Sequence, residues 1–162
     1  MQLDLFRPED ADAVFRIIQE NYQTVLAPFY SPEAIAHSLM SYHTPSRLRE
    51  AAEKARATYV ARDGTDLKGT GQLTWREDTK ERLFIGRVYV DVRAHGQGVG
   101  QLLMAGLEAV AKKEAEEVWL YAVIHPRTVE FYQKQGYEIL EHKNFPLPQG
   151  GVFPCELMVK KL

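Results

Sequence analysis

The sequence is poor in cysteine and has no cluster of metal-binding residues. Its single cysteine, Cys155, excludes an internal disulfide and any zinc site built on several thiolates. Because Cys155 stands in a predicted closing strand beside Pro154, we expect it to pack as a small core residue. The histidines lack the spacing of metal ligands, so we predict no bound metal. They are His37, His43, His95, His125 and His142.

Neither a strong excess of one charge nor a long hydrophobic run is present. Twenty Lys and Arg against 22 Asp and Glu give a net charge of −2, and no basic stripe stands out, so we expect no nucleic-acid partner. No apolar run approaches the roughly 20 residues of a membrane helix. The first residues, MQLDLFRPED, carry acids where a signal peptide would be apolar. We therefore expect a cytoplasmic protein without membrane association.

The composition that is present fits one folded domain spanning residues 1–162. Of the 162 residues, 45% are hydrophobic and 26% are charged, which is enough to build a core. Strand patterns occur at 2–6, 58–61, 67–76, 82–92, 118–124, 137–142 and 152–160. One helical pattern begins at Pro8, and a short one lies between Pro32 and Pro45. Further helical patterns cover 46–56, 99–111 and 126–135, and Gly136 is the expected C-cap of the last. A charged turn is expected over 77–81. The sequence therefore predicts an α/β protein.

A glycine-rich loop, HGQGVG at residues 95–100, joins a predicted strand directly to the clearest helix. Glycines at alternate positions leave one edge of the turn without side chains. Backbone amides can then converge on an anion, and the positive end of the helix dipole adds to the attraction. The loop therefore indicates a phosphate-binding site. The alternative is a turn that only eases packing of the helix against the strand.

The spacing of the glycines excludes two common phosphate-binding motifs. A Walker loop requires Gly-x-x-x-x-Gly-Lys-Ser/Thr, but the pair Gly64 and Gly69 is followed by Thr70. A dinucleotide fingerprint requires Gly-x-Gly-x-x-Gly, but the sixth position counted from Gly96 is Gln101. The loop must therefore serve another phosphate-bearing ligand, if it serves one.

Two segments together resemble the GCN5-related N-acetyltransferase (GNAT) superfamily. The stretch VYVDVRAHGQGVGQLL at 88–103 resembles its central motif, a strand followed by Arg/Gln-x-x-Gly-x-Gly/Ala and a helix. The glycines fall on Gly98 and Gly100, while His95 stands where Arg or Gln is usual. The strand at 118–123 and the helix ending VEFYQKQGY at 129–137 are similar to the second motif. His125 stands where the family often has Asn. The N-terminal third matches only in element order.

The resemblance implies a GNAT-like α/β fold in which a mixed, mostly antiparallel sheet is splayed between its central strands and flanked by helices. It also implies acetyl-CoA as the acyl-donor cosubstrate, with its pantetheine arm entering the gap like an added strand. The implied cofactor-binding residues are Val88, Tyr89, Val90, His95, Gly96, Gln97, Gly98, Val99, Gly100, Gln101 and His125. The three strand residues among them could also be ordinary core residues.

The resemblance further implies an N-acetyltransferase that moves an acetyl group directly to a primary amine of a small molecule or peptide. Tyr132 matches the family tyrosine near the coenzyme A sulfur, where a neutral phenol can donate a proton to the departing thiolate. The alternative is an aromatic core residue beside Phe131. Protein lysine or N-terminal acetylation and a non-catalytic acetyl-CoA sensor remain as other functions. The resemblance also allows a homodimer.

The general base and the acceptor pocket are less determined by the sequence. A base is useful because an alkylamine with a pKa near 10 is protonated at pH 7. The candidates are Asp91, Glu77, Asp78, Tyr89 and His125, and a water chain is an equal alternative. We expect the acceptor site among the first helices, the 27–45 segment and the 144–154 connection. An aromatic wall is expected there from Tyr22, Phe29, Tyr30, Tyr42 and Phe145.

Overall fold

A computed structural model describes residues 1–76 and 79–162, with the backbone alone for residues 79–81. The strands are β1 (Gln2–Leu5), β2 (Ala57–Asp63), β3 (Asp66–Arg76), β4 (Thr79–Val90), β5 (Glu117–Val123), β6 (Glu138–Pro146) and β7 (Val152–Lys161). The helices are α1 (Ala11–Glu20), α2 (Pro32–Tyr42), α3 (Pro45–Lys54), α4 (Val99–Ala111) and α5 (Pro126–Lys134). Short helical turns lie at η1 (Pro8–Asp10) and η3 (Val92–Ala94), and a π-helix, η2 (Asn21–Leu26), extends α1.

The predicted elements are present, with shifted ends. The turn expected over 77–81 is wrong for residues 79–81, which already belong to β4, and its first two residues lie outside the described part. The π-helix was not predicted, and β6 runs four residues past the predicted end at His142. Gly136 follows α5 with a positive φ of 93°, as expected of a residue that ends a helix.

Local sequence explains where the first helices begin. Ser31 and Thr44 each accept a hydrogen bond through the side chain from a backbone amide three residues later. Each is followed by a proline at the first helical position, which needs no hydrogen-bond acceptor there. These caps set α2 and α3 as two short helices in the segment that follows the π-helix.

The seven strands form one sheet in the order β1-β2-β3-β4-β5-β7-β6. All neighbours are antiparallel except β4 and β5, which run parallel and are connected through α4. This parallel pair is short: only Leu83–Ile85 pairs with Val118–Leu120, although both strands continue beyond that point. The sheet is therefore splayed between its central strands, which confirms the expected architecture.

A β-bulge in β4 lies where the splay begins. Gln72 of β3 is in register with Gly86, and Thr70 with Tyr89, so β4 holds one extra residue there. Arg87, at the bulge, has a φ of 51°, the one positive φ of a non-glycine residue in the described chain. Bulges bend the strand that contains them and increase its twist. The bulge thus helps β4 to diverge from β5.

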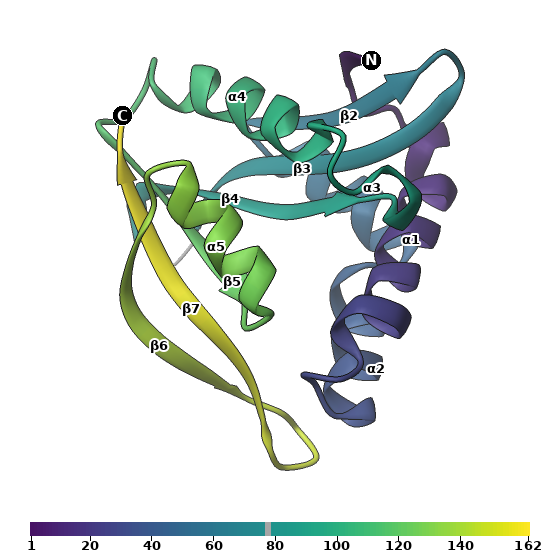
Figure 1. Cartoon of the computed structure of the whole chain (residues 1–162), viewed down its shortest axis with the longest axis vertical. Coiled ribbons are helices and arrows are strands. Elements are labelled where there is room, and N and C mark those ends of the chain that lie inside the picture. Colours follow the sequence, from purple (N-terminus) through teal and green to yellow (C-terminus); the bar gives the residue numbers. More distant parts are fainter. Residues whose placement is uncertain (77–78) are drawn as a thin grey trace.

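Helices cover the two faces of the sheet separately (Figure 1). On one face α4 packs so closely on β3 that a Cβ added at Gly71 would lie 2.9 Å from Leu107 of α4. The same face carries α5, whose Tyr132 belongs to the hydrophobic cluster around Leu107. The helices α1 to α3 and the π-helix bury a second cluster, which includes Ile18 and Tyr22, against the other face.

Candidate functional site

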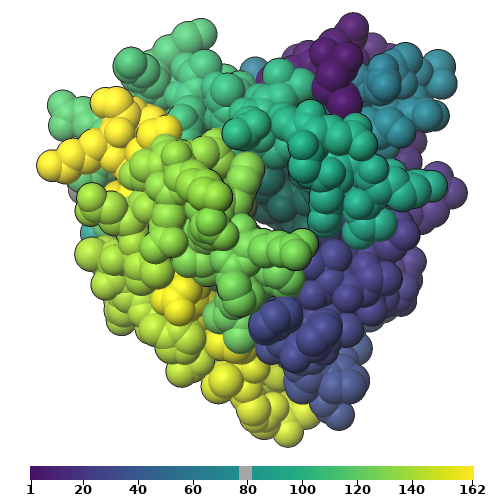
Figure 2. Space-filling view, viewed as in Figure 1, coloured from purple at the N-terminus to yellow at the C-terminus, as the bar shows by residue number. Residues whose placement is uncertain are grey.

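A cleft of about 590 Å³ opens between the diverging ends of β4 and β5. Figure 2 shows the hollow near the centre of the molecule, between the β4–α4 connection in teal and the α5 region in green. The cleft contains most of the residues expected to bind a cofactor, and the side chain of Tyr132. The lining includes Val88, Tyr89, Val90, His95, Gly96, Gly98, Val99, Gly100, Gln101, His125 and Tyr132.

The first turn of α4 presents backbone amides at one end of this cleft. Gly98 is the N-cap residue with a φ of 82°, a conformation that favours glycine, and no side chain caps the helix. The amide of Leu102 is the first to bond within the helix, donating to the Gly98 carbonyl at 3.0 Å. The preceding amides at 99–101 have no acceptor within the helix. No acidic side chain lies in this turn, so the arrangement suits an anion.

Gly100 allows α4 to approach α5 closely. A Cβ built at Gly100 would lie 2.9 Å from Cζ of Phe131, whose ring belongs to α5 and lines the cleft. Any larger residue would push this ring away. The last glycine of the loop therefore has a packing role in addition to any part in ligand binding.

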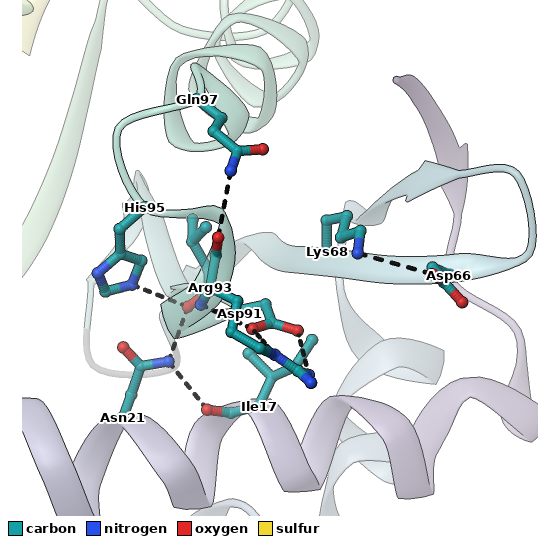
Figure 3. A network of polar contacts seen from close by, with 9 residues as sticks. Ile17, Asn21, Asp66, Lys68, Asp91, Arg93, His95 and Gln97 are labelled. Carbon is teal, nitrogen blue, oxygen red and sulfur yellow. Dashed lines mark hydrogen bonds and ion pairs between the residues drawn. The ribbon is translucent and has the colours of Figure 1, made fainter.

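A polar network anchors the glycine loop to the end of β4 (Figure 3). The Val90 carbonyl accepts hydrogen bonds from Nδ2 of Asn21 at 2.8 Å and from Nε2 of His95 at 3.0 Å. Asn21 also donates to the Ile17 carbonyl at 2.9 Å. Both lone pairs of the Val90 carbonyl are thus used. The Val90 carbonyl is therefore not available to an added strand, and His95 ties the loop to β4.

Gln97 and Asp91 lie apart from the cleft. The Gln97 side chain is exposed and donates from Nε2 to the Arg93 carbonyl at 3.1 Å. Asp91 accepts from the Arg93 amide and pairs with the Arg93 guanidinium at 2.8 Å, contacts that lower the pKa of its carboxyl. It lines a separate charged cleft beside α1. Asp91 is therefore a poor candidate for the general base, and Glu77 and Asp78 lie outside the described residues.

Tyr132 is buried, yet its hydroxyl has no hydrogen-bond partner among the described residues. Its ring contacts Phe131 and Tyr137, with centroids 5.2 Å and 5.8 Å away. Burial raises the pKa of the phenol above its usual value of 10. Tyr132 thus presents a protonated hydroxyl at the cleft at neutral pH, whichever ligand it meets.

His125 also lines the cleft and immediately precedes α5, the helix that carries Tyr132. Its Nδ1 accepts a hydrogen bond from the Arg127 amide at 3.1 Å, so the residue serves as the N-cap of the helix. Its ring packs on Phe29 at 4.7 Å. Desolvation, followed by the nearby charge of Arg127, lowers the pKa of the imidazole. His125 is therefore largely neutral at pH 7 and already uses one nitrogen for structure.

The remaining tyrosines expected at the site are largely structural. The Tyr89 hydroxyl donates to the Tyr22 hydroxyl at 3.0 Å, and burial raises the pKa of Tyr89 well above 10, so it is no base at neutral pH. The expected aromatic wall is wrong for Tyr22 and Tyr30, which are 2% and 5% exposed and belong to the core. Of the exposed members, Tyr42 instead contacts His37 on its own helix.

Several residues of the cleft were missed by the sequence interpretation. They are Asn21, Val25, Leu26, Ala94, Val123, Arg127, Thr128 and Phe131. The first three come from the π-helix, whose wider turn the helical pattern does not reveal. Asn21 did leave a signal, because it is a polar residue that continues the apolar face of the preceding helix.

Among the described residues, no three His, Cys, Asp or Glu side chains are grouped closely enough to share a metal ion. In the same part of the chain, no helix is both long and apolar enough to span a membrane.

Comparisons with known proteins point to one family. The model of the acetyltransferase (GNAT) family matches residues 12–137. A GCN5-related N-acetyltransferase structure from Rhodopseudomonas palustris superposes with a TM-score of 0.84 at 21% identity, covering 99% of this chain and 95% of that one. The PaiA N-acetyltransferase of Thermoplasma acidophilum, in complex with coenzyme A, gives 0.78 at 18%, covering 99% and 98%.

A third structure, YncA from Salmonella typhimurium, is described as a putative acetyltransferase with its cofactor acetyl-CoA. It gives a TM-score of 0.72 at 15% identity, covering 100% of this chain and 94% of that one. No curated protein sequence matches the chain. The similarity of this chain to known proteins therefore rests on the match to the family model and on the shared fold.

Proposed function

The chain belongs to the acetyltransferase (GNAT) family, and we propose that it transfers the acetyl group of acetyl-CoA directly to a primary amine of a small molecule or peptide. The main support for this proposal is the combination of three features in one cleft. These are a helix start that begins with glycine and has no side-chain cap, two strands that diverge after three paired residues, and a buried tyrosine whose hydroxyl has no hydrogen-bond partner in the described part of the chain. Two structural neighbours contain coenzyme A or acetyl-CoA.

The described residues fit such a cosubstrate. The amides that follow Gly98 would hold its pyrophosphate, because they lack acceptors and lie at the positive end of α4. The pantetheine arm would lie along Val88 and Tyr89, beyond the last β4–β5 pair. The Val90 carbonyl is occupied, so it takes no part in this pairing. His95 and His125 would border the mouth of the cleft.

Acetyl-CoA supplies an activated acetyl group as a thioester, which an amine attacks with release of the thiol. Tyr132 would donate its proton to the departing sulfur, since its raised pKa keeps the phenol protonated. The walls of the cleft would position the two reactants, and such positioning lowers the barrier by about 7 kcal/mol or more. Of the base candidates among the described residues, His125 fits best, with a water chain as the alternative, because Asp91 and Tyr89 are engaged elsewhere.

Turnover with a panel of primary amines tests the proposal. We expect thiol release from acetyl-CoA and an equal amount of acetylated amine, together with thermal stabilisation by acetyl-CoA alone. Stabilisation without thiol release across a broad panel would favour the acetyl-CoA sensor. Release only with lysine-bearing or N-terminal protein substrates would favour protein acetylation. If acetyl-CoA caused no thermal stabilisation and no thiol were released, the cofactor assignment itself would be contradicted.

A further inference from the structure

Arg87 is a partly buried cation that pairs with no carboxylate of the described residues. Its Nη1 donates to Oε1 of Gln72 at 2.7 Å, and its Nη2 donates to the Tyr42 carbonyl at 3.0 Å. Both acceptors are neutral. Nε is buried without a hydrogen-bond partner, and among the described residues the guanidinium forms no ion pair. The contacts therefore orient the positive charge without neutralising it.

Arg62, which is also partly buried, shows how the chain treats such a charge elsewhere. Its side chain is 16% exposed and pairs with Asp10 at 2.7 Å and with Asp4 at 3.3 Å. Burying an unpaired charge is costly, so partners of this kind are the rule. Arg87 departs from the rule within the same sheet.

The groups packed around Arg87 are uncharged at neutral pH. His43 is 7% exposed, burial lowers its pKa to about 3, and its Nδ1 has no partner. The phenols of Tyr22 and Tyr89 have raised pKa values because they are buried. A single positive charge thus lies in a neutral shell built from α2, β3, β4 and the π-helix.

Arg87 precedes the first β4 residue that lines the cleft. Pairing between β4 and β5 ends at Ile85, and Val88, next to Arg87, already lines the cleft. Val88 faces the α4 side, because its Cγ2 lies 3.6 Å from a Cβ built at Gly71. The Arg87 side chain instead reaches the opposite face, where it bonds Gln72 and the carbonyl of Tyr42, a residue that is 54% exposed. Arg87 is partly exposed on that face and is not among the residues that line the cleft.

We propose that Arg87 binds a carboxylate of the acceptor, so that the substrate is an amino acid or another amine bearing one carboxylate. The inference rests on the proposed function, because it places the acceptor opposite the cofactor side of the gap. Of the five N–H donors of a guanidinium, two are used, and the planar fork matches a planar carboxylate. One charge in a neutral shell is balanced by a monoanion, which favours a carboxylate over a phosphate of nearly two charges.

Matched amine pairs that differ only in the anionic group test this assignment. We would compare β-alanine with its amide and L-phenylalanine with its amide, measuring kcat/KM from thiol release. A charge-assisted contact predicts a preference of about tenfold or more for at least one carboxylate. Arg87→Gln is expected to remove this preference. Arg82→Gln, at an exposed arginine on the same strand, should retain it. No preference in the wild type, or one that survives Arg87→Gln, would overturn the assignment.

A binding experiment separates this inference from the proposed function. Propionate, which carries the anion without the amine, should raise the melting temperature of the wild type but not of Arg87→Gln, whereas propionamide should raise neither. Equal stabilisation of both proteins by acetyl-CoA verifies folding of the variant. If no amine is acetylated, the proposed function fails, and the propionate result still decides on Arg87. A propionate shift absent from the wild type, or retained in the variant, contradicts anion binding.

Arg87→Lys covers the case in which the glutamine variant does not fold. It keeps the charge but loses the fork, so the carboxylate preference should fall by about threefold or more. An unchanged preference would overturn the role of the guanidinium.

Discussion

Two tyrosines five residues apart differ in the hydrogen bonding of their hydroxyl groups. The Tyr137 hydroxyl donates to Oε1 of Glu108 at 2.9 Å, and Glu108 also pairs with Lys160. The Tyr132 hydroxyl has no such partner in the part of the chain that the structure describes, and Tyr132 lines the cleft. One phenol is committed to structure, while the other is free to act on a ligand. The two residues therefore form a natural pair for separating function from stability.

Replacing Tyr132 with phenylalanine should lower kcat for acetyl transfer by about 100-fold, because the proton donor is lost. The Kd for acetyl-CoA should change by less than about twofold, since little contact area is removed. Steady-state kinetics and calorimetric titration measure both quantities. Tyr137→Phe is the control and should lose about 1 kcal/mol of stability with kcat unchanged. Unchanged turnover in Tyr132→Phe would remove this residue from the mechanism.

The buried His43 predicts a pH dependence of stability. Above its unfolded pKa of 6.5 the imidazole is neutral in both states, so it contributes no slope. Below pH 6.5 the His43 imidazole is protonated in the unfolded chain, whereas in the native protein it stays neutral down to its lowered pKa of about 3. The free energy of unfolding should therefore fall by about 1.4 kcal/mol for each pH unit below 6.5. Urea unfolding at pH 7 and pH 5 measures this loss, and His43→Phe should reduce it. An equal loss in the variant would assign it to other groups.

At the element scale, the start of α4 packs against α5. Because Gly100 has no side chain, the first turn of α4 can pack closely against Phe131. The loop that precedes α4 is bound to β4 through the hydrogen bond of His95. The bulge at Arg87 and the π-helix shape the facing walls. The shape of the cleft thus depends on irregular backbone in the glycine loop, the β-bulge and the π-helix.

Gly100→Ala should weaken acetyl-CoA binding and cost about 1 to 3 kcal/mol of stability, because its methyl group would lie 2.9 Å from the Phe131 ring. Gly86→Ala is the matched control, since a Cβ there meets nothing within 4 Å and its φ is not positive. Chemical denaturation and acetyl-CoA titration compare the two variants. Equal effects would show that the α4–α5 contact is not the cause.

The regular helices and strands could be predicted from the sequence, whereas the irregular backbone and the long-range contacts at their ends could not. Helical periodicity located α4, and a continuous apolar run located β5, because both patterns are local. The glycine loop could also be recognised, since its proposed role depends on the backbone conformation that its glycines allow. The second bond to the Val90 carbonyl, by contrast, comes from Asn21, 69 residues earlier in the chain. The isolation of Arg87 from carboxylates likewise depends on packing between α2 and β4, which no local pattern encodes.

At the scale of the whole molecule, Tyr30 joins the two sides of the splayed sheet. It belongs to the segment between the π-helix and α2, yet its hydroxyl donates to the Pro154 carbonyl at 2.6 Å and accepts from the Ile124 amide at 3.0 Å. Its ring stacks on Phe153 at 4.4 Å. One residue thus ties the N-terminal helices to the ends of β5 and the start of β7.

Tyr30→Phe should reduce the free energy of unfolding by about 2 to 4 kcal/mol, because a buried amide and a carbonyl each lose a partner. Urea denaturation followed by circular dichroism measures the change. Tyr42→Phe, at an exposed tyrosine of the same region, should stay within about 0.5 kcal/mol of the wild type. A similarly small effect of Tyr30→Phe would mean that the two sides are held together elsewhere.

A crystal structure with bound acetyl-CoA tests the central claim most directly. We predict pyrophosphate oxygens about 3 Å from the α4 amides that follow Gly98, the pantetheine arm between β4 and β5, and the thioester sulfur within reach of the Tyr132 hydroxyl. A cofactor bound outside this cleft, or a sulfur remote from Tyr132, would contradict the account.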